Sequence, residues 1–117
     1  SDPGRPIYLD EVALSFPELN IIGCNLGQPW TEEMMILSWK HPNLYIETSA
    51  RTPKYWPKEF IHFCKSYGQD KVLWATDFPL LTFERTLYEI DEFGFEPAIR
   101  EKLIRTNAIN ALKLNLR

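Results

Sequence analysis

The sequence predicts an α/β fold in which parallel strands alternate with helices and the chain ends in helices. Three short apolar runs with strand character are separated by segments whose apolar residues recur at helical spacing. The last run is continuous rather than alternating, which is typical of a strand buried on both faces of a parallel sheet. Strands that alternate with helices in this way form βαβ units joined by right-handed crossovers.

Local patterns set the expected limits of the first elements. The strands are expected at residues 19–24, 44–48 and 72–76. A first helix is expected from Pro6 to about Phe16, because apolar residues recur at i, i+3, i+4 and i+7 and Pro17 then ends it. The second helix should begin near Thr31, which can cap it, and end before Pro42.

The later helices are predicted from their apolar stripes and their end signals. A third helix is expected over about 57–67, with Gly68 as the C′ residue. Two helices follow the last strand: Gly94 ends the first of them and Pro97 opens the second. The first carries an apolar stripe formed by Phe83, Leu87 and Ile90.

Composition limits the class of protein. A chain of 117 residues is expected to form one domain, 1–117, and 44% hydrophobic with 25% charged residues is an ordinary globular composition. The net charge of −3 gives no basic footprint for a nucleic acid. No apolar run reaches the roughly 18 residues of a membrane span, so a cytoplasmic location is expected. Cys24 and Cys64 are expected to be buried free thiols rather than a disulfide.

Polar residues stand at the carboxyl ends of the three expected strands. Asn25 follows the first strand, Glu47 and Ser49 end the second, and Asp77 follows the third. Parallel strands share their carboxyl edge, where α/β folds place their chemistry. The alternative interpretation of Asp77 is a turn former ahead of Pro79, and Glu47 needs a partner if it is buried.

A set of short motifs in a fixed order resembles the amidohydrolase-related (amidohydrolase 2) family over almost the whole chain. The motifs are Pro6-Ile-Tyr-Leu-Asp-Glu-Val-Ala13, Phe16-Pro17, Gly27-x-Pro29-Trp30, His41-Pro42-Asn43-x-Tyr45, Thr48-Ser49, Thr76-Asp77-x-Pro79 and Asn107-Ala108. The family comprises metal-dependent hydrolases and decarboxylases on a (β/α)8 barrel. The resemblance therefore implies the carboxyl-terminal portion of a TIM-like barrel.

The resemblance also implies roles for individual residues. Asp77 matches the aspartate that ends the last barrel strand, contacts the divalent metal (zinc above all) and handles a proton. Asn25 stands where the family has a histidine, and an amide is neither a general base nor a strong zinc ligand. Asn25, Trp30 and Ser49 are expected substrate contacts. His41 and His62 are not expected to bind metal.

Two hypotheses of different classes follow. In the first, the chain supplies the last strands of a metal-dependent hydrolase or decarboxylase acting on a small carboxylated or aromatic compound. In the second, it is a degenerate half-barrel that serves as a scaffold, assembly or ligand-binding module. The family's other metal-binding histidines would precede Ser1, so this chain alone is not expected to hold a metal tightly. Three strands also leave two open edges, for which a second copy or the rest of the barrel is the expected partner.

Overall fold

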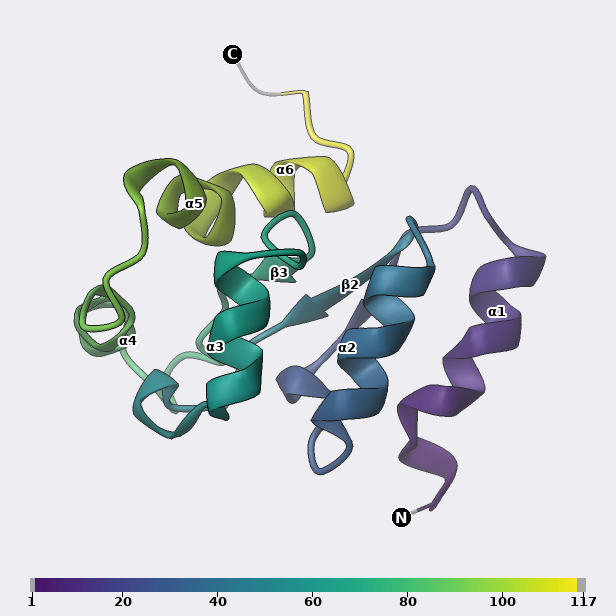
Figure 1. Ribbon diagram of the computed structural model, residues 1–117, viewed down its shortest axis with the longest axis horizontal. Coiled ribbons are helices and arrows are strands. Elements are labelled where there is room, and N and C mark those ends of the chain that lie inside the picture. Colours follow the sequence, from purple (N-terminus) through teal and green to yellow (C-terminus); the bar gives the residue numbers. More distant parts are fainter. Residues whose placement is uncertain (1, 116–117) are drawn as a thin grey trace.

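The computed structural model describes residues 2–115 and contains a three-stranded parallel sheet with helices packed on it (Figure 1). The strands lie in the order β1 (Ile21–Gly23), β2 (Leu44–Glu47) and β3 (Val72–Leu73). They are joined by α2 (Thr31–Lys40) and α3 (Lys58–Lys65), which cover one face of the sheet. The predicted α/β class with parallel, alternating strands is confirmed.

All three strands are shorter than predicted, and β3 is cut short because the residues after it bond to other groups. Trp74 N donates to Leu103 O at 3.0 Å, and Ala75 N donates to the hydroxyl of Thr48 at 3.1 Å, so the chain leaves the β3 ladder after Leu73. The middle strand carries the centre of the core. Leu44 and Ile46 are fully buried, and the other largest fully buried side chains of this core are Phe60, Phe63, Leu26, Met34 and Ile90.

The first helix differs from the prediction in its limits and in its anchoring. A 3₁₀ turn covers Pro6–Tyr8, and α1 runs over Leu9–Ser15. Phe16, expected to face the core, is 56% exposed. Instead, the amide of Asn43 donates to three main-chain carbonyl groups around the end of this helix, those of Ala13, Phe16 and Leu19. Leu9 and Ala13 of the expected apolar stripe do reach the core, and these polar contacts hold the end of the helix where Phe16 does not.

The ends of the two covering helices also correct the sequence interpretation. Thr31 does not cap α2: it is the first helical residue, and its buried hydroxyl has no hydrogen-bond partner among the described residues. Helix α3 ends at Lys65, so Gly68 is not its C′ residue. A glycine is needed at position 68 because the Phe63 ring occupies the space of a side chain: a Cβ there would lie 2.3 Å from that ring.

The helical tail comprises α4 (Phe83–Asp91), α5 (Pro97–Glu101), a π-helical turn (Lys102–Thr106) and α6 (Asn107–Ala111). Phe83 is 49% exposed, so the predicted stripe of α4 is partly wrong, and Thr86 takes a buried position beside Ile90. The tail covers the outer edge of β3 (Figure 1). Besides the bond from Trp74 to Leu103, Asn107 Nδ2 donates to Gln69 O and Val72 O, both at 2.8 Å. One of the two edges expected to be open is therefore partly closed.

Both cysteines are free thiols, as predicted, but only Cys64 is buried. Cys24 is exposed because β1 has already ended when the chain reaches it. Between residues 2 and 115, no helix is long and apolar enough to cross a bilayer.

Candidate active site at the carboxyl edge of the sheet

The residues that follow the three strands lie together at one edge, here called the carboxyl rim: Cys24–Gly27, Thr48–Ala50 and Thr76–Asp77. Each part of the rim contains a non-glycine residue with positive φ. The values are 56° for Asn25 and 59° for Leu26, 60° for Ala50 and 61° for Asp77. Residues other than glycine rarely adopt a backbone conformation with positive φ, and those that do concentrate at functional sites. Among the described residues, only Lys113 shares this property elsewhere.

Asn25, Glu47 and Ser49 form a closed hydrogen-bond network at the rim. The carboxylate oxygen Oε1 of Glu47 accepts from Asn25 N at 2.8 Å, from Ser49 N at 3.1 Å and from Ser49 Oγ at 2.6 Å. Asn25 Nδ2 donates to the carbonyl and the hydroxyl of Ser49, at 2.8 and 2.9 Å. Glu47 thus has the partners that its partly buried position requires.

This network fixes the orientation of the Asn25 amide. A main-chain carbonyl can only accept, so Ser49 O identifies the atom facing it as the amide nitrogen. Both Nδ2 hydrogens are used by Ser49, which leaves Oδ1 as the group that Asn25 offers to a ligand. A ligand group next to Asn25 must therefore be a hydrogen-bond donor.

Asp77 is exposed and lies four residues beyond the end of β3, after Trp74, Ala75 and Thr76. The turn that carries it is held by other groups: Thr76 Oγ1 accepts from Phe78 N at 3.1 Å, and Asp77 O accepts from Leu80 N at 2.9 Å. The side chain itself makes no hydrogen bond or ion pair with another described residue, so it does not act as a turn cap. A main-chain bond from Ala50 N to Thr76 O places this turn beside the Ser49 segment.

Cys24 within the rim and Trp30 outside it contribute differently. Cys24 is exposed, and desolvation followed by the Glu47 charge raises the pKa of its thiol, so the protonated form is favoured. Trp30 lies away from the network. Its ring stacks under the Arg5 guanidinium at 5.6 Å and lines a separate hollow with Pro29, Met35 and Pro57.

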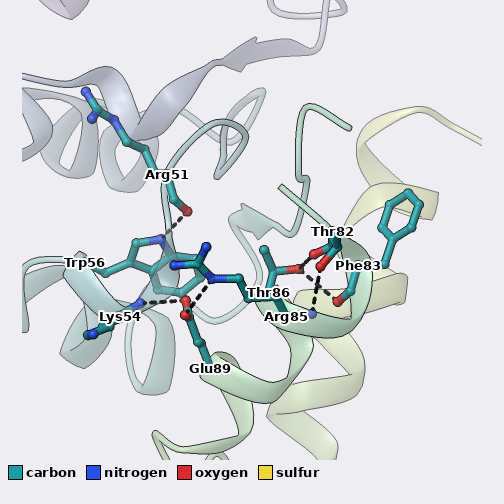
Figure 2. Close-up of polar contacts among 8 residues, drawn as sticks. All are labelled: Arg51, Lys54, Trp56, Thr82, Phe83, Arg85, Thr86 and Glu89. Atoms are coloured by element: carbon teal, nitrogen blue, oxygen red, sulfur yellow. Dashed lines mark hydrogen bonds and ion pairs between the residues drawn. The ribbon is translucent and has the colours of Figure 1, made fainter. Parts of the chain in front are cut away.

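A small hollow of about 130 Å³ adjoins the rim between Leu26, Ala50 and the loop that contains Arg51 and Trp56. Trp56 Nε1 donates to Arg51 O at 3.3 Å, which folds this loop back on itself (Figure 2). Glu89 of α4 accepts from Lys54 N at 3.2 Å, so the helical tail supports the loop from outside. The far wall of the hollow is therefore held in place by α4.

Sequence reasoning placed Asn25, Glu47 and Ser49 at one edge but gave Glu47 no role in the site, although the structure makes Glu47 the centre of the network. The signal was present: a lone carboxylate at the end of a buried strand, two residues before a serine. The positive φ of Ala50 had no such signal.

Comparison with known proteins identifies the family. A family model described as Amidohydrolase matches residues 1–114. This chain belongs to the amidohydrolase family. No match was found among curated proteins.

Solved structures of similar fold are TIM barrels and amidohydrolases. An uncharacterised TIM-barrel protein from Bordetella bronchiseptica is 25% identical with a TM-score of 0.75, over 92% of this chain and 39% of its own. An amidohydrolase 2 from Bifidobacterium longum subsp. infantis is 24% identical with a TM-score of 0.62, over 95% and 48%. An amidohydrolase from Burkholderia multivorans with bound zinc is 9% identical with a TM-score of 0.63, over 92% and 48%. The chain thus spans less than half the length of these structures.

The residues present do not by themselves form a metal site. Within residues 2–115, no three histidine, cysteine, aspartate or glutamate side chains lie close enough together to hold an ion. His41 is buried and bonded through Nε2 to Asp10 Oδ1 at 2.7 Å, and His62 is exposed. Catalytic zinc takes three protein ligands, and Asp77 is the one carboxylate at the rim that no other described side chain engages.

Proposed function

We propose that this chain provides the last strands of the barrel of a metal-dependent hydrolase or decarboxylase that acts on a small carboxylated or aromatic compound. The observation that carries the proposal is the carboxyl rim: an uncommitted carboxylate, Asp77, beside an ordered polar network on strained backbone. Membership of the amidohydrolase family supports the class of reaction.

Each of the site residues predicted from the sequence has a proposed role. Asp77 accepts or donates the proton of the reacting group, because its carboxylate is exposed and engaged by no other described residue. Asn25 accepts a hydrogen bond from the substrate through Oδ1, and Ser49 holds that amide in position. Trp30 contacts only a substrate long enough to reach its hollow.

Zinc is the proposed metal, as in the zinc-bound neighbour from Burkholderia multivorans. Since the described residues do not gather three ligands, the ion depends on ligands outside them, and no catalytic step of this chain is assigned to it. The contribution derived for this chain is proton transfer and substrate orientation at the rim.

Replacing Asp77 by asparagine tests the proposal. We expect turnover to fall at least about 100-fold, the usual contribution of a general acid or base, with little change in stability because the residue is exposed. Carbon dioxide release from aromatic carboxylates and hydrolysis of small esters and amides would be measured in the presence of zinc. Glu84→Gln is the matched control, since Glu84 is an exposed carboxylate in the first turn of α4. Equal turnover in the two variants would exclude Asp77 from the reaction.

The alternative is a catalytically degenerate half-barrel that serves as a scaffold, assembly or ligand-binding module. Two observations favour it: the amide at position 25, and the absence of a three-ligand cluster among residues 2–115. A protein that binds no zinc and turns over none of these compounds would support this alternative. Turnover that is lost in Asp77→Asn would exclude it.

We also propose that further protein covers the surface around α1. Five of its large apolar side chains are 46% to 60% exposed, namely Ile7, Tyr8, Leu14, Phe16 and Leu19. Apolar patches of this kind mark interaction surfaces. The rest of a barrel or a second copy of this chain fits the position, because β1 beside it is an edge strand.

A further inference from the structure

A second hollow, of about 340 Å³, lies at the opposite end of the sheet from the carboxyl rim. It is here called the lysine hollow and is lined by Trp39, Pro42, Tyr45, Tyr67, Asp70, Lys71 and Asn110. Lys71 directly precedes β3 and Pro42 precedes β2, so the hollow opens at the amino ends of the strands. Its volume falls in the range of small-molecule sites, about 300–1,000 Å³.

Lys71 is the one cation in the lining of this hollow, and its ammonium group is held in a fixed position. Nζ donates to His41 O at 2.8 Å and to Pro42 O at 3.1 Å, and it lies 4.8 Å from the centre of the Tyr45 ring. An ammonium group has three N–H donors, so one remains after these two bonds. Among the described residues, no carboxylate forms an ion pair with it.

The neighbouring acid does not cancel this charge. Asp70 pairs with Lys102 at 2.8 Å, so the local balance of Asp70, Lys71 and Lys102 is one positive charge. Asn110 adds an exposed amide, which can donate as well as accept. These groups are complementary to an anion with oxygen acceptors, above all a carboxylate.

Apart from Pro42, the other residues that line the hollow are aromatic. Trp39 on α2 is 65% exposed and Tyr67, beyond the end of α3, is 55% exposed. Exposed aromatic rings are costly to leave in water and offer flat faces for stacking. Together with Tyr45, they favour a planar ligand over a flexible aliphatic one.

We propose that the lysine hollow binds a small aromatic carboxylate, with its ring between Trp39 and Tyr67 and its carboxylate on Lys71. This site goes beyond the proposed function at the carboxyl rim and shares no residue with it. The proposal concerns reversible binding and no chemical reaction. It therefore applies whether or not the chain is catalytic.

Naphthoate and its uncharged analogue naphthalenemethanol test the proposal, with binding followed by tryptophan fluorescence and by calorimetry on the full chain. We expect Lys71→Met to weaken the binding of naphthoate about tenfold, as for loss of a charged hydrogen bond, and to leave the affinity for the analogue unchanged. Trp39→Ala should weaken both ligands about fivefold, as for loss of an aromatic contact. Ile36→Ala is the control, because Ile36 is exposed on the same helix but lies outside the hollow.

The pH profile of the unmodified protein gives an independent readout. Burial lowers the pKa of Lys71 to about 8, and the Asp70 charge opposes this shift. Only the protonated amine attracts a carboxylate, so naphthoate affinity should be full below pH 8 and fall as the pH rises above it. The other titratable groups that line the hollow are Asp70, which is paired with Lys102, Tyr45 from β2, and Tyr67; the His41 ring is turned to Asp10.

Three results would overturn the proposal. The first is no binding of naphthoate, and the second is equal binding of naphthoate and its analogue at every pH. The third is naphthoate binding that survives both Lys71→Met and Trp39→Ala. Because Trp39 is exposed, its variant remains informative even if Lys71→Met, which loses two bonds to carbonyl groups, is unstable.

Discussion

At the scale of single residues, the carboxyl rim depends on how one carboxylate is used. Glu47 accepts three hydrogen bonds through one oxygen, and two of the donors are main-chain N–H groups on either side of the rim. Those groups cannot turn away to find other partners, since their segments are fixed by β1 and β2. The position of Asn25 therefore depends on Glu47 even though Ser49 takes both amide hydrogens.

Removing the Glu47 carboxylate should destabilise the fold. In Glu47→Ala three donors lose their acceptor, and for partly buried groups we expect a loss of about 2 kcal/mol in the free energy of unfolding. Glu47→Gln keeps an acceptor oxygen and should lose less than about 1 kcal/mol. Urea unfolding at constant m-value measures both. Equal losses in the two variants would show that the carboxylate oxygen is not what joins β1 to β2 here.

Sequence reasoning at this scale succeeded where a residue's position along a strand decides its place. Asn25, Ser49 and Asp77 were placed at one edge because parallel strands share their carboxyl ends, and the structure puts the first two in contact. It could not give the direction of the Asn25 amide, because that direction comes from Ser49 O, a main-chain atom with no sequence signature. It also could not give the contact of Trp30 with Arg5, which lies far away in the chain.

At the scale of elements, the helical tail forms some of the hydrogen bonds that a neighbouring strand would form at the edge of β3. Its contacts are a main-chain carbonyl from the π-helical turn and the amide of Asn107 from α6. A sequence pattern predicts that a helix exists but not that one of its carbonyl groups will accept from a strand. The prediction of an open edge beyond β3 is only partly right for this reason.

Asn107→Ala should loosen this edge specifically. The side chain is 1% exposed, and its loss leaves the carbonyl groups of Gln69 and Val72 without that donor. We expect a loss of about 1–3 kcal/mol in the free energy of unfolding. Amide hydrogen exchange should speed up at Trp74 before it does in β1. Asn110→Ala is the control, one turn later and exposed; an equal change there would contradict a specific role for Asn107.

At the scale of the whole molecule, the sequence predicted the class, the strand number and the alternation, because each rests on local periodicity. It did not predict which apolar stripes would stay in solvent. The pattern around α1 is that of a helix with a buried face, yet Val12 and Phe16 of that pattern are 36% and 56% exposed. The neighbours of similar fold have more than twice the matched length, and such additional structure can cover a face of this kind.

The exposed apolar side chains around α1 lead to a prediction about assembly. The chain should associate in solution, because exposed apolar side chains around α1 gain about 25 cal/mol for each Å² removed from water. Native mass spectrometry should show dimers or larger species, and Phe16→Glu should return the chain to a monomer. Tyr88→Glu is the control, since Tyr88 is 69% exposed on α4, far from α1 in sequence.

Adding zinc to the same samples separates the two proposals for the rim. Zinc retained only by the associated form would mean that the ligands missing from one chain are completed across the contact, whereas a metal-free assembly would favour the scaffold alternative.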